Sequence, residues 1–200
     1  MSTITIPRPA AGPPSDPYRL TVWQYERLVE AGVLTEDDQV ELINGFLVLK
    51  MAKGPVHTAT VIDTRDAFLR LIPGGWHVQT EAPVRIPDFD EPEPDVAVVR
   101  GKARDYVALN RPPEASEVCL NVEVAESSLP RDRGEKMVAY ATGRVPVYWI
   151  INLLDGQVEV YTDPVPGFYR SHQTFRPGES VPMIVTGAEV GRIPVDHMLP

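Results

Sequence analysis

The sequence predicts an α/β domain in which helices flank a mixed central sheet, with β-hairpins added to it. Short valine-rich runs that are typical of strands recur along the chain, and runs free of proline and glycine that are typical of helices lie between them. The length of 200 residues and the apolar fraction of 43% favour a single domain with a buried core. The composition excludes disordered, collagenous and coiled-coil chains.

The N-terminal part of the chain predicts an arm followed by a helix. Five of the 21 prolines fall within residues 1–17, which predicts an extended arm, and we expect residues 18–200 to form the domain. Thr21 is a suitable N-cap for a short amphipathic helix, and Gly32 is a suitable stop. The apolar residues on one face of this helix are Val22, Tyr25, Leu28 and Val29.

The next elements are a hairpin, a long helix and the strands of the sheet. The Asn44-Gly45 pair, between two alternating runs, predicts a β-hairpin over residues 39–52. An uninterrupted run over residues 56–71 predicts the longest helix. Residues 101–116 are expected to be a polar loop that joins two of the following strands. These strands are expected at residues 76–81, 95–100 and 118–125.

A second helix and a second hairpin are predicted in the C-terminal half. Asp132 and Glu135 form a capping box for a helix over residues 133–143, which ends in glycine. Alternating runs around an Asp-Gly turn predict a hairpin over residues 147–163. Glycine and proline recur from Pro164 onward, which predicts short strands and loops.

Charge and cysteine usage limit the function classes. The formal net charge of -9 excludes a protein that coats DNA by overall attraction, so any nucleic-acid contact needs a local basic surface. The single cysteine, Cys119, cannot form an internal disulfide, and no Cys/His cluster has zinc-site spacing. We find neither a membrane-spanning run nor a secretion signal, so we expect a cytoplasmic protein with no membrane partner.

Two acidic residues on predicted central strands are the first candidates for chemistry. Glu123 lies in a strand that is apolar on both faces, and a carboxylate buried there needs a partner. Asp95 opens the neighbouring valine-rich strand. Together they could hold Mg²⁺, which prefers a few carboxylate oxygens and water. The alternatives are a turn residue for Asp95, which follows Pro94, and an ion pair with a core lysine or arginine for Glu123.

Lys136 is the third candidate. It follows Glu123 by 13 positions, at the start of the next predicted helix, and the intervening connection can fold its ammonium back over the end of the strand. The alternative is an i to i+4 ion pair with Asp132 on an exposed helix face.

Four segments of the chain occur in the order found in the Uma-type family of restriction endonucleases. They are ELINGFLVL, the strand EPDVAVV, NVEVAESS and DRGEKMVAYATGRVPVYWIIN. Residues 18–163 resemble that family, which belongs to the PD-(D/E)xK nuclease superfamily with its restriction-endonuclease-like fold. The resemblance implies that Asp95 and Glu123 are the acidic residues of the motif. Ala125 stands where the superfamily usually has its lysine, and the resemblance implies that Lys136 replaces it from the next helix.

The resemblance implies hydrolysis of DNA phosphodiester bonds with Mg²⁺, for which Mn²⁺ substitutes. Asp95, Glu123 and the carbonyl of Val124 would hold the ion, Lys136 would orient the attacking water, and Glu41 would add a further metal-binding carboxylate. The alternative for Glu41 is an exposed hairpin residue. His57 is a possible accessory residue, and its alternative is a helix cap or a surface residue.

Basic residues on two segments are candidates for DNA contacts that do not depend on base sequence. Each of them could instead be an exposed loop charge. They are Arg100, Lys102, Arg104 and Arg111 after the Asp95 strand, and Arg131 and Arg133 before Lys136.

We interpret the chain as a Mg²⁺-dependent DNA endonuclease of the PD-(D/E)xK type. A homodimer is expected, because cutting both strands of a duplex commonly uses two symmetric sites. A rival function is a catalytically inactive module of the same fold that binds a protein or nucleic-acid partner, which the net charge of -9 and Ala125 favour. A third is a hydrolase of small phosphoesters, which the lack of a glycine-rich phosphate loop disfavours.

Overall fold

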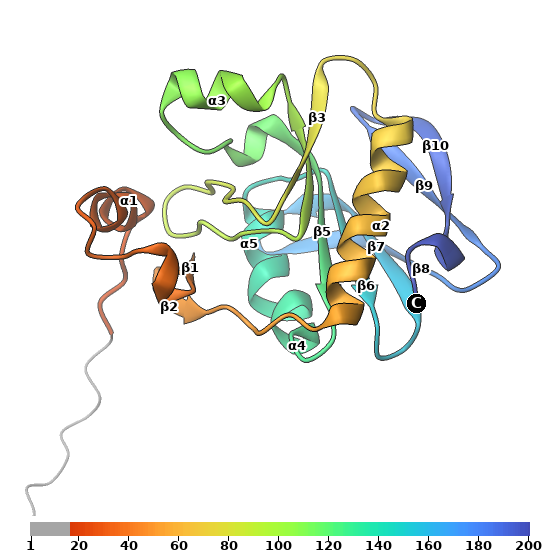
Figure 1. The fold of residues 1–200 in the computed structure, drawn as a ribbon, viewed down its shortest axis with the longest axis horizontal. Helices are drawn as coiled ribbons and strands as arrows, with labels where there is room; N and C mark the ends of the chain where they lie inside the picture. The colour runs from red at the N-terminus through yellow and green to blue at the C-terminus, as the bar shows by residue number, and fades with distance from the viewer. Residues whose placement is uncertain (1–16) are drawn as a thin grey trace, which may run out of the picture.

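A mixed sheet forms the centre of the molecule (Figure 1). The structure, a computed structural model, describes residues 17–200. Strands β5 and β6 are parallel and all other neighbours in this sheet are antiparallel. The predicted fold class is therefore confirmed, and the arm predicted for residues 1–17 falls almost entirely outside the described residues. In spatial order the six strands are β3 (Trp76–Thr80), β4 (Val96–Arg100), β5 (Val118–Ala125), β6 (Val147–Asn152), β7 (Gln157–Val165) and β8 (Phe168–Phe175).

Helices cover both faces of the sheet because its central strands are apolar on both sides. All eight residues of β5 are buried. Helix α2 (Pro55–Leu71) packs on one face through Phe68, whose ring meets Trp149 edge-on at 5.3 Å between centroids. Helix α5 (Met137–Thr142) packs on the other face, where Tyr140 contacts Tyr148 at 5.0 Å. Strands β9 (Ser180–Val185) and β10 (Ala188–Pro194) form a hairpin that extends the α2 side of the core.

The N-terminal elements form a separate small layer beside the sheet (Figure 1). Thr21 and Gln24 make the capping box of α1 (Val22–Glu30). The predicted hairpin is present as β1 (Val40–Ile43) and β2 (Phe46–Leu49), joined by Asn44 and Gly45 with φ of 51° and 80°. The buried face of α1 is narrower than predicted: Val22 and Tyr25 pack on Leu42, while Val29 is 47% exposed.

Two predicted elements differ from the structure. The polar loop over residues 101–116 contains helix α3 (Ala103–Leu109), whose first turn is capped by the side chain of Asp105, which accepts from the backbone N–H of Lys102 at 2.8 Å. No residue of α3 is buried. The sequence of α3 therefore lacks the regular spacing of apolar residues by which a helix is predicted.

The capping box at Asp132 is the second error. The helix begins earlier, as α4 (Leu129–Arg131), and continues through a π-helical turn, η3 (Asp132–Lys136), into α5. Asp132 therefore lies inside the helix, where its carboxylate accepts from the hydroxyl of Ser128 at 2.6 Å. Among residues 17–200, no helix is both long and apolar enough to span a membrane.

A buried acid beside the N-terminal layer makes stability depend on pH. Glu91 is 6% exposed, and burial together with the charge of Glu26 raises its pKa from 4.5 to about 8. As pH rises from 4.5 to about 8, the unfolded chain gives up this proton and the folded chain keeps it, so the free energy of unfolding decreases. We expect Glu91→Gln to remove this decrease, which is at most about 1.4 kcal/mol per pH unit.

The measurement is urea unfolding of the wild type and Glu91→Gln across this pH range. The stability advantage of the variant should grow with pH. Glu36→Gln, at an exposed position, is the control and should follow the wild type. Parallel pH curves for wild type and Glu91→Gln would contradict the assignment.

Candidate active site

The register between β4 and β5 brings the two acidic candidates together. Val96 pairs with Val122, so Asp95 lies one position further, opposite Glu123. Directly opposed residues of antiparallel strands point to the same face, with Cβ atoms about 5 Å apart. The side chains of Asp95 and Glu123 are 6% and 4% exposed. Asp95 is therefore not simply an exposed turn residue after Pro94.

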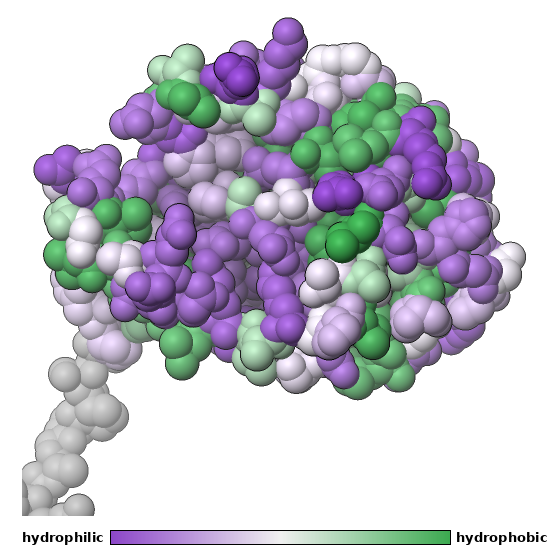
Figure 2. Space-filling view, viewed as in Figure 1, coloured by the Kyte–Doolittle hydropathy of each residue, from purple (hydrophilic) through white to green (hydrophobic). Residues whose placement is uncertain are grey.

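A hydrophilic pocket opens over these two carboxylates. Figure 2 shows hydrophilic side chains around a hollow between the β1–β2 hairpin and the N-terminal end of α2. Its walls come from β1, the segment after β2, the start of α2, the ends of β4 and β5, and helix α4 with the following π-helical turn. The residues with charged or imidazole side chains that line it are Glu41, Lys50, Lys53, His57, Glu93, Asp95, Glu123, Glu126, Arg131, Asp132 and Lys136.

Asp95 is held as a carboxylate by three neighbours. Its Oδ2 accepts the backbone N–H of Val124 at 2.8 Å and lies 3.2 Å from Nε2 of His57. Its Oδ1 accepts from the ammonium of Lys53 at 2.9 Å. Burial by itself would raise the pKa of Asp95, but the contacts with His57, Lys53 and Val124 outweigh it and lower the pKa to about 2. Asp95 is therefore ionised at neutral pH.

Glu123 accepts hydrogen bonds from residues of the π-helical turn and of α5. Its Oε1 accepts from the ammonium of Lys136 at 3.0 Å and from the hydroxyl of Tyr140 at 2.6 Å. Burial raises the pKa of Glu123 well above its usual range, and the charge of Asp95 adds to this, although Lys136 opposes it. The ion pair with a core lysine, which the sequence left as an alternative, is present, and the lysine is the candidate Lys136.

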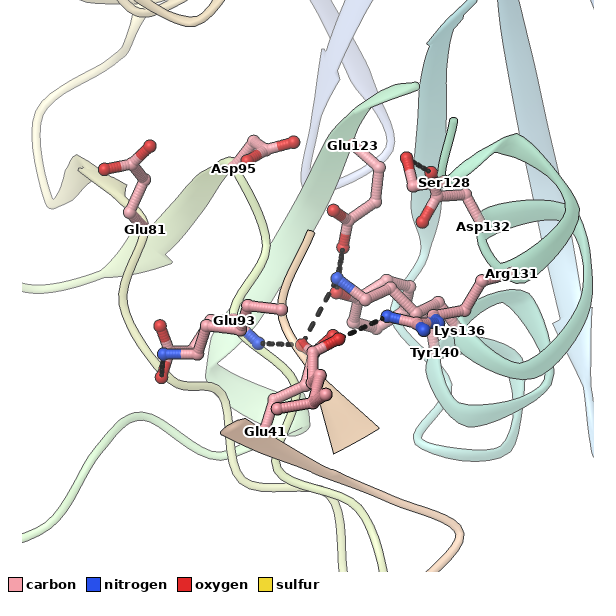
Figure 3. Close-up of polar contacts among 12 residues, drawn as sticks. Glu41, Glu81, Glu93, Asp95, Glu123, Ser128, Arg131, Asp132, Lys136 and Tyr140 are labelled. Atoms are coloured by element: carbon pink, nitrogen blue, oxygen red, sulfur yellow. Dashed lines mark hydrogen bonds and ion pairs between the residues drawn. The ribbon is translucent and has the colours of Figure 1, made fainter. Parts of the chain in front are cut away.

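Lys136 joins two carboxylates from distant parts of the chain. Figure 3 shows Glu123 and Glu41 on two sides of its ammonium, at 3.0 and 3.2 Å. Their charges outweigh burial and raise the pKa of Lys136 above its ordinary value, so the side chain stays an ammonium. Its ion pairs in the described part of the chain do not include Asp132, so the alternative of an exposed i to i+4 pair is wrong.

Glu41 and His57 also differ from their simpler alternatives. Glu41 is 2% exposed rather than on an open hairpin face, and its Oε2 accepts the backbone N–H of Glu93 at 3.0 Å. His57 lies within the first turn of α2, where Gly54 is the N-cap, and its ring is buried against Asp95. Both residues belong to the pocket.

Sequence reasoning missed three residues of this cluster. Asp132 lines the pocket at 1% exposure, and burial raises its pKa to about 6. Tyr140 donates to Glu123, and its position four residues after Lys136 on the same helix face was a usable signal. Lys53 had no such signal, because it lies in an irregular segment. The charges of Asp95 and Glu81 outweigh partial burial and raise the pKa of Lys53.

Most of the predicted DNA-contacting residues lie elsewhere. Arg100 is at the opposite end of β4 from Asp95, about 17 Å along a five-residue strand, and its guanidinium lies 5.2 Å from the ring centre of Trp76. Lys102 and Arg104 follow it around the start of α3, which Figure 1 shows far from α4. The structure therefore does not bring these three to the pocket.

The remaining arginines divide in the same way. Arg111 forms an ion pair with Glu117, and Arg133 binds the buried carboxylate of Glu159, so neither lines the pocket. Arg131 does line it, and its guanidinium donates to the carbonyl of Leu49 at 2.9 Å. Arg111 is held by a carboxylate six residues away, whereas Arg131 and Arg133 are placed by long-range contacts that charge along the sequence could not reveal.

The donor set fits Mg²⁺ as a two-carboxylate site. Among residues 17–200, no three His, Cys, Asp or Glu side chains are grouped to hold a metal by themselves. Magnesium in phosphoryl-transfer sites commonly takes one or two carboxylates and completes its shell with water and substrate phosphate. Asp95 and Glu123 supply hard oxygen donors. Burial raises the pKa of Glu123, the charges of Asp95, Asp132 and Glu41 add to this rise, and a divalent cation would relieve the repulsion among these carboxylates.

The family of the chain follows from its whole sequence. A model of the Uma2 family, described as "Putative restriction endonuclease", matches residues 22–192. The chain belongs to the Uma2 family. The resemblance that the sequence motifs suggested is thus confirmed, and it extends beyond residue 163. Comparison with curated proteins gives no match.

A solved structure agrees with this fold. A crystal structure described as a putative nuclease of DUF820 from Anabaena variabilis superposes with a TM-score of 0.68 and 15% sequence identity. The match covers 90% of this chain and 97% of that one. At this identity the similarity shows the shared fold, and membership in the Uma2 family places the chain among endonucleases.

Proposed function

We propose that this Uma2-family chain hydrolyses DNA phosphodiester bonds, with Mg²⁺ held by Asp95 and Glu123 and with Mn²⁺ as a substitute. The observation that carries the proposal is the convergence of these two carboxylates and the ammonium of Lys136 on one pocket, from positions 28 and 13 residues apart in the sequence. The PD-(D/E)xK motif combines two acidic residues on paired strands with a lysine, and here the lysine comes from the helix that follows β5. The backbone carbonyl of Val124 is proposed as a further metal ligand, because the backbone N–H of the same residue already binds Asp95.

The chemistry that a bound Mg²⁺ supplies is electrostatic stabilisation of the negative charge that develops on the phosphate. Val124 and His57 hold Oδ2 of Asp95 in place, and Lys53 balances its negative charge at Oδ1. Lys136 keeps its proton and can donate hydrogen bonds to the attacking water or to a phosphate oxygen, while Glu41 holds it in place.

The substrate phosphate is proposed to enter at the mouth of the pocket. The cationic side chains there are Lys50, Lys53 and Arg131. We propose these three as the phosphate contacts; of them, the sequence had suggested only Arg131. Their removal should weaken DNA binding evenly across sequences, because phosphate contacts carry no base information. A homodimer that acts in the cytoplasm remains part of the proposal.

The direct test is the conversion of supercoiled plasmid to nicked and linear forms by the purified chain. We expect cleavage with Mg²⁺ or Mn²⁺ and none with EDTA. The rival function, a nuclease-fold module that binds a partner without cleaving DNA, predicts DNA or protein binding with no nicking in any metal. Cleavage that persists in EDTA would contradict the metal-dependent mechanism.

Metal binding has its own prediction at Glu123. Mn²⁺ should raise the melting temperature of the wild type, because a ligand that binds only the folded state stabilises it. Glu123→Ala should lose this response. Glu126→Ala is the matched control, since Glu126 lines the same pocket but is exposed, and it should respond like the wild type. Equal shifts in Glu123→Ala and wild type would remove Glu123 from the proposed ligands.

A further inference from the structure

Two lysines on one irregular segment reach the mouth of the pocket. Residues 50–54 join β2 to α2 without regular structure. The ammonium of Lys50 binds Glu93 at 2.6 Å, and that of Lys53 lies between Glu81 and Asp95, at 2.9 Å from each. Lys53 thus contacts a proposed metal ligand directly, whereas Lys50 does not.

The oxygen that Lys53 occupies is the one that a metal ion would need. Oδ2 of Asp95 is committed to the backbone N–H of Val124 and to His57. Within the described residues, the hydrogen-bond partner of Oδ1 is Lys53 alone. Because the rest of the carboxylate is fixed from inside the fold, an ion from the pocket must approach at Oδ1.

We propose that the Lys53 ammonium occupies the cation position at Asp95 in the metal-free protein and competes with the divalent ion for it. This inference rests on the proposed metal site. Two cations bound to one carboxylate oxygen repel each other strongly in a buried site, so the ammonium must leave when the ion binds. Lys53 is a positioning residue in this scheme, not a catalytic one.

The surroundings of Lys53 allow this exchange. Its side chain is 35% exposed, and its second acceptor, Glu81, is 50% exposed. In Figure 3, Glu81 lies on the side of Asp95 that is away from Glu123. A displaced ammonium can therefore stay with Glu81 or reach solvent near Lys50 and Arg131, where the substrate phosphate is proposed to enter.

A functional consequence follows from this competition. An ammonium released by the metal adds positive charge at the pocket mouth, so metal binding and phosphate binding favour each other. By linkage, a bound DNA phosphate that attracts Lys53 would raise metal affinity by the same factor. Without DNA, Lys53 would lower the affinity of the site for the metal and keep Asp95 neutralised.

The test is the affinity for Mn²⁺ alone, measured from the signal of the free ion by electron paramagnetic resonance. Lys53→Met should bind Mn²⁺ about three- to five-fold more tightly than wild type, the range that a partly exposed ion pair contributes. Lys50→Met removes the same charge from the same segment but no contact with Asp95, so it should change the affinity much less. Adding Asp95→Asn to Lys53→Met should abolish the gain.

The outcomes separate this inference from the proposed function. Equal or weaker Mn²⁺ binding by Lys53→Met, or an equal gain in Lys50→Met, would overturn the competition while leaving a DNA-cleaving wild type intact. Tighter binding by Lys53→Met in a protein that never nicks DNA would support the competition and contradict the endonuclease. If no variant binds Mn²⁺, both proposals are wrong.

Discussion

Asp95→Asn is expected to reduce plasmid cleavage by about 10³-fold, or about 4 kcal/mol of transition-state stabilisation. The asparagine side chain has the same shape, and its carbonyl oxygen can still accept the backbone N–H of Val124, so the strand end is preserved. What disappears is the ionised oxygen facing the pocket, which is the proposed ligand for Mg²⁺. The measurement is the initial rate of nicking with Mg²⁺.

The control for this variant is Asp63→Asn, which removes one negative charge from the exposed side of α2. It should cleave at the wild-type rate. Activity that survives in Asp95→Asn would point to a contaminating nuclease and remove Asp95 from the mechanism. Retained folding in both variants is checked by their melting temperatures in EDTA.

Lys136→Met is expected to abolish cleavage and to lower the free energy of unfolding by about 3 kcal/mol. Breaking a buried pair by removing one partner leaves the other charge uncompensated, at a cost of about 3 to 5 kcal/mol. Here Glu123 and Glu41 both lose their cation. Glu123 can take up a proton, which limits the loss of stability. We therefore expect a value at the lower end of this range of free energies.

This loss should depend on pH with a definite sign. In the wild type Lys136 lowers the raised pKa of Glu123, and without Lys136 this pKa is higher still. Above the wild-type pKa of Glu123, only the folded variant keeps a proton that the unfolded chain has released. The stability gap between the wild type and Lys136→Met should therefore widen with pH in urea unfolding. A constant gap would show that the lysine acts by packing and not by charge.

A double variant separates stability from catalysis. Lys136→Met combined with Glu123→Gln leaves a neutral amide at the end of β5, which can still accept from the hydroxyl of Tyr140. We expect it to recover much of the lost stability and none of the nicking activity. Recovery of cleavage would exclude both residues from the active site.

The sequence contained enough local information for most elements and for the central residues of the site. Capping residues, the Asn44-Gly45 turn and valine-rich strands act over a few positions, so they predict α1, both main hairpins and the strands of the sheet. Glu123 was recognisable because a carboxylate in an apolar strand is costly without a partner. Local signals failed where no periodicity existed, as in the exposed helix α3.

The arrangement of charges around the site depended on contacts that no local pattern encodes. The motif indicated Asp95 and Glu123, and the spacing after Glu123 together with the family resemblance indicated Lys136. The capping box predicted at Asp132 was wrong, because this residue lies inside a longer helix. A π-helical turn directs Lys136 inward, and the hairpin carries Glu41 to it from 95 residues earlier.

The sequence by itself determined which residue types could do the chemistry and on which strands they lie, because burial and strand propensity act along the chain. Only the tertiary structure decided that Asp95 faces Glu123, that Lys53 neutralises Asp95, and that Arg100 lies at the other end of β4. Strand register and the direction of a side chain across a sheet are set by long-range pairing. A residue five positions along a strand can therefore lie too far from the site to take part.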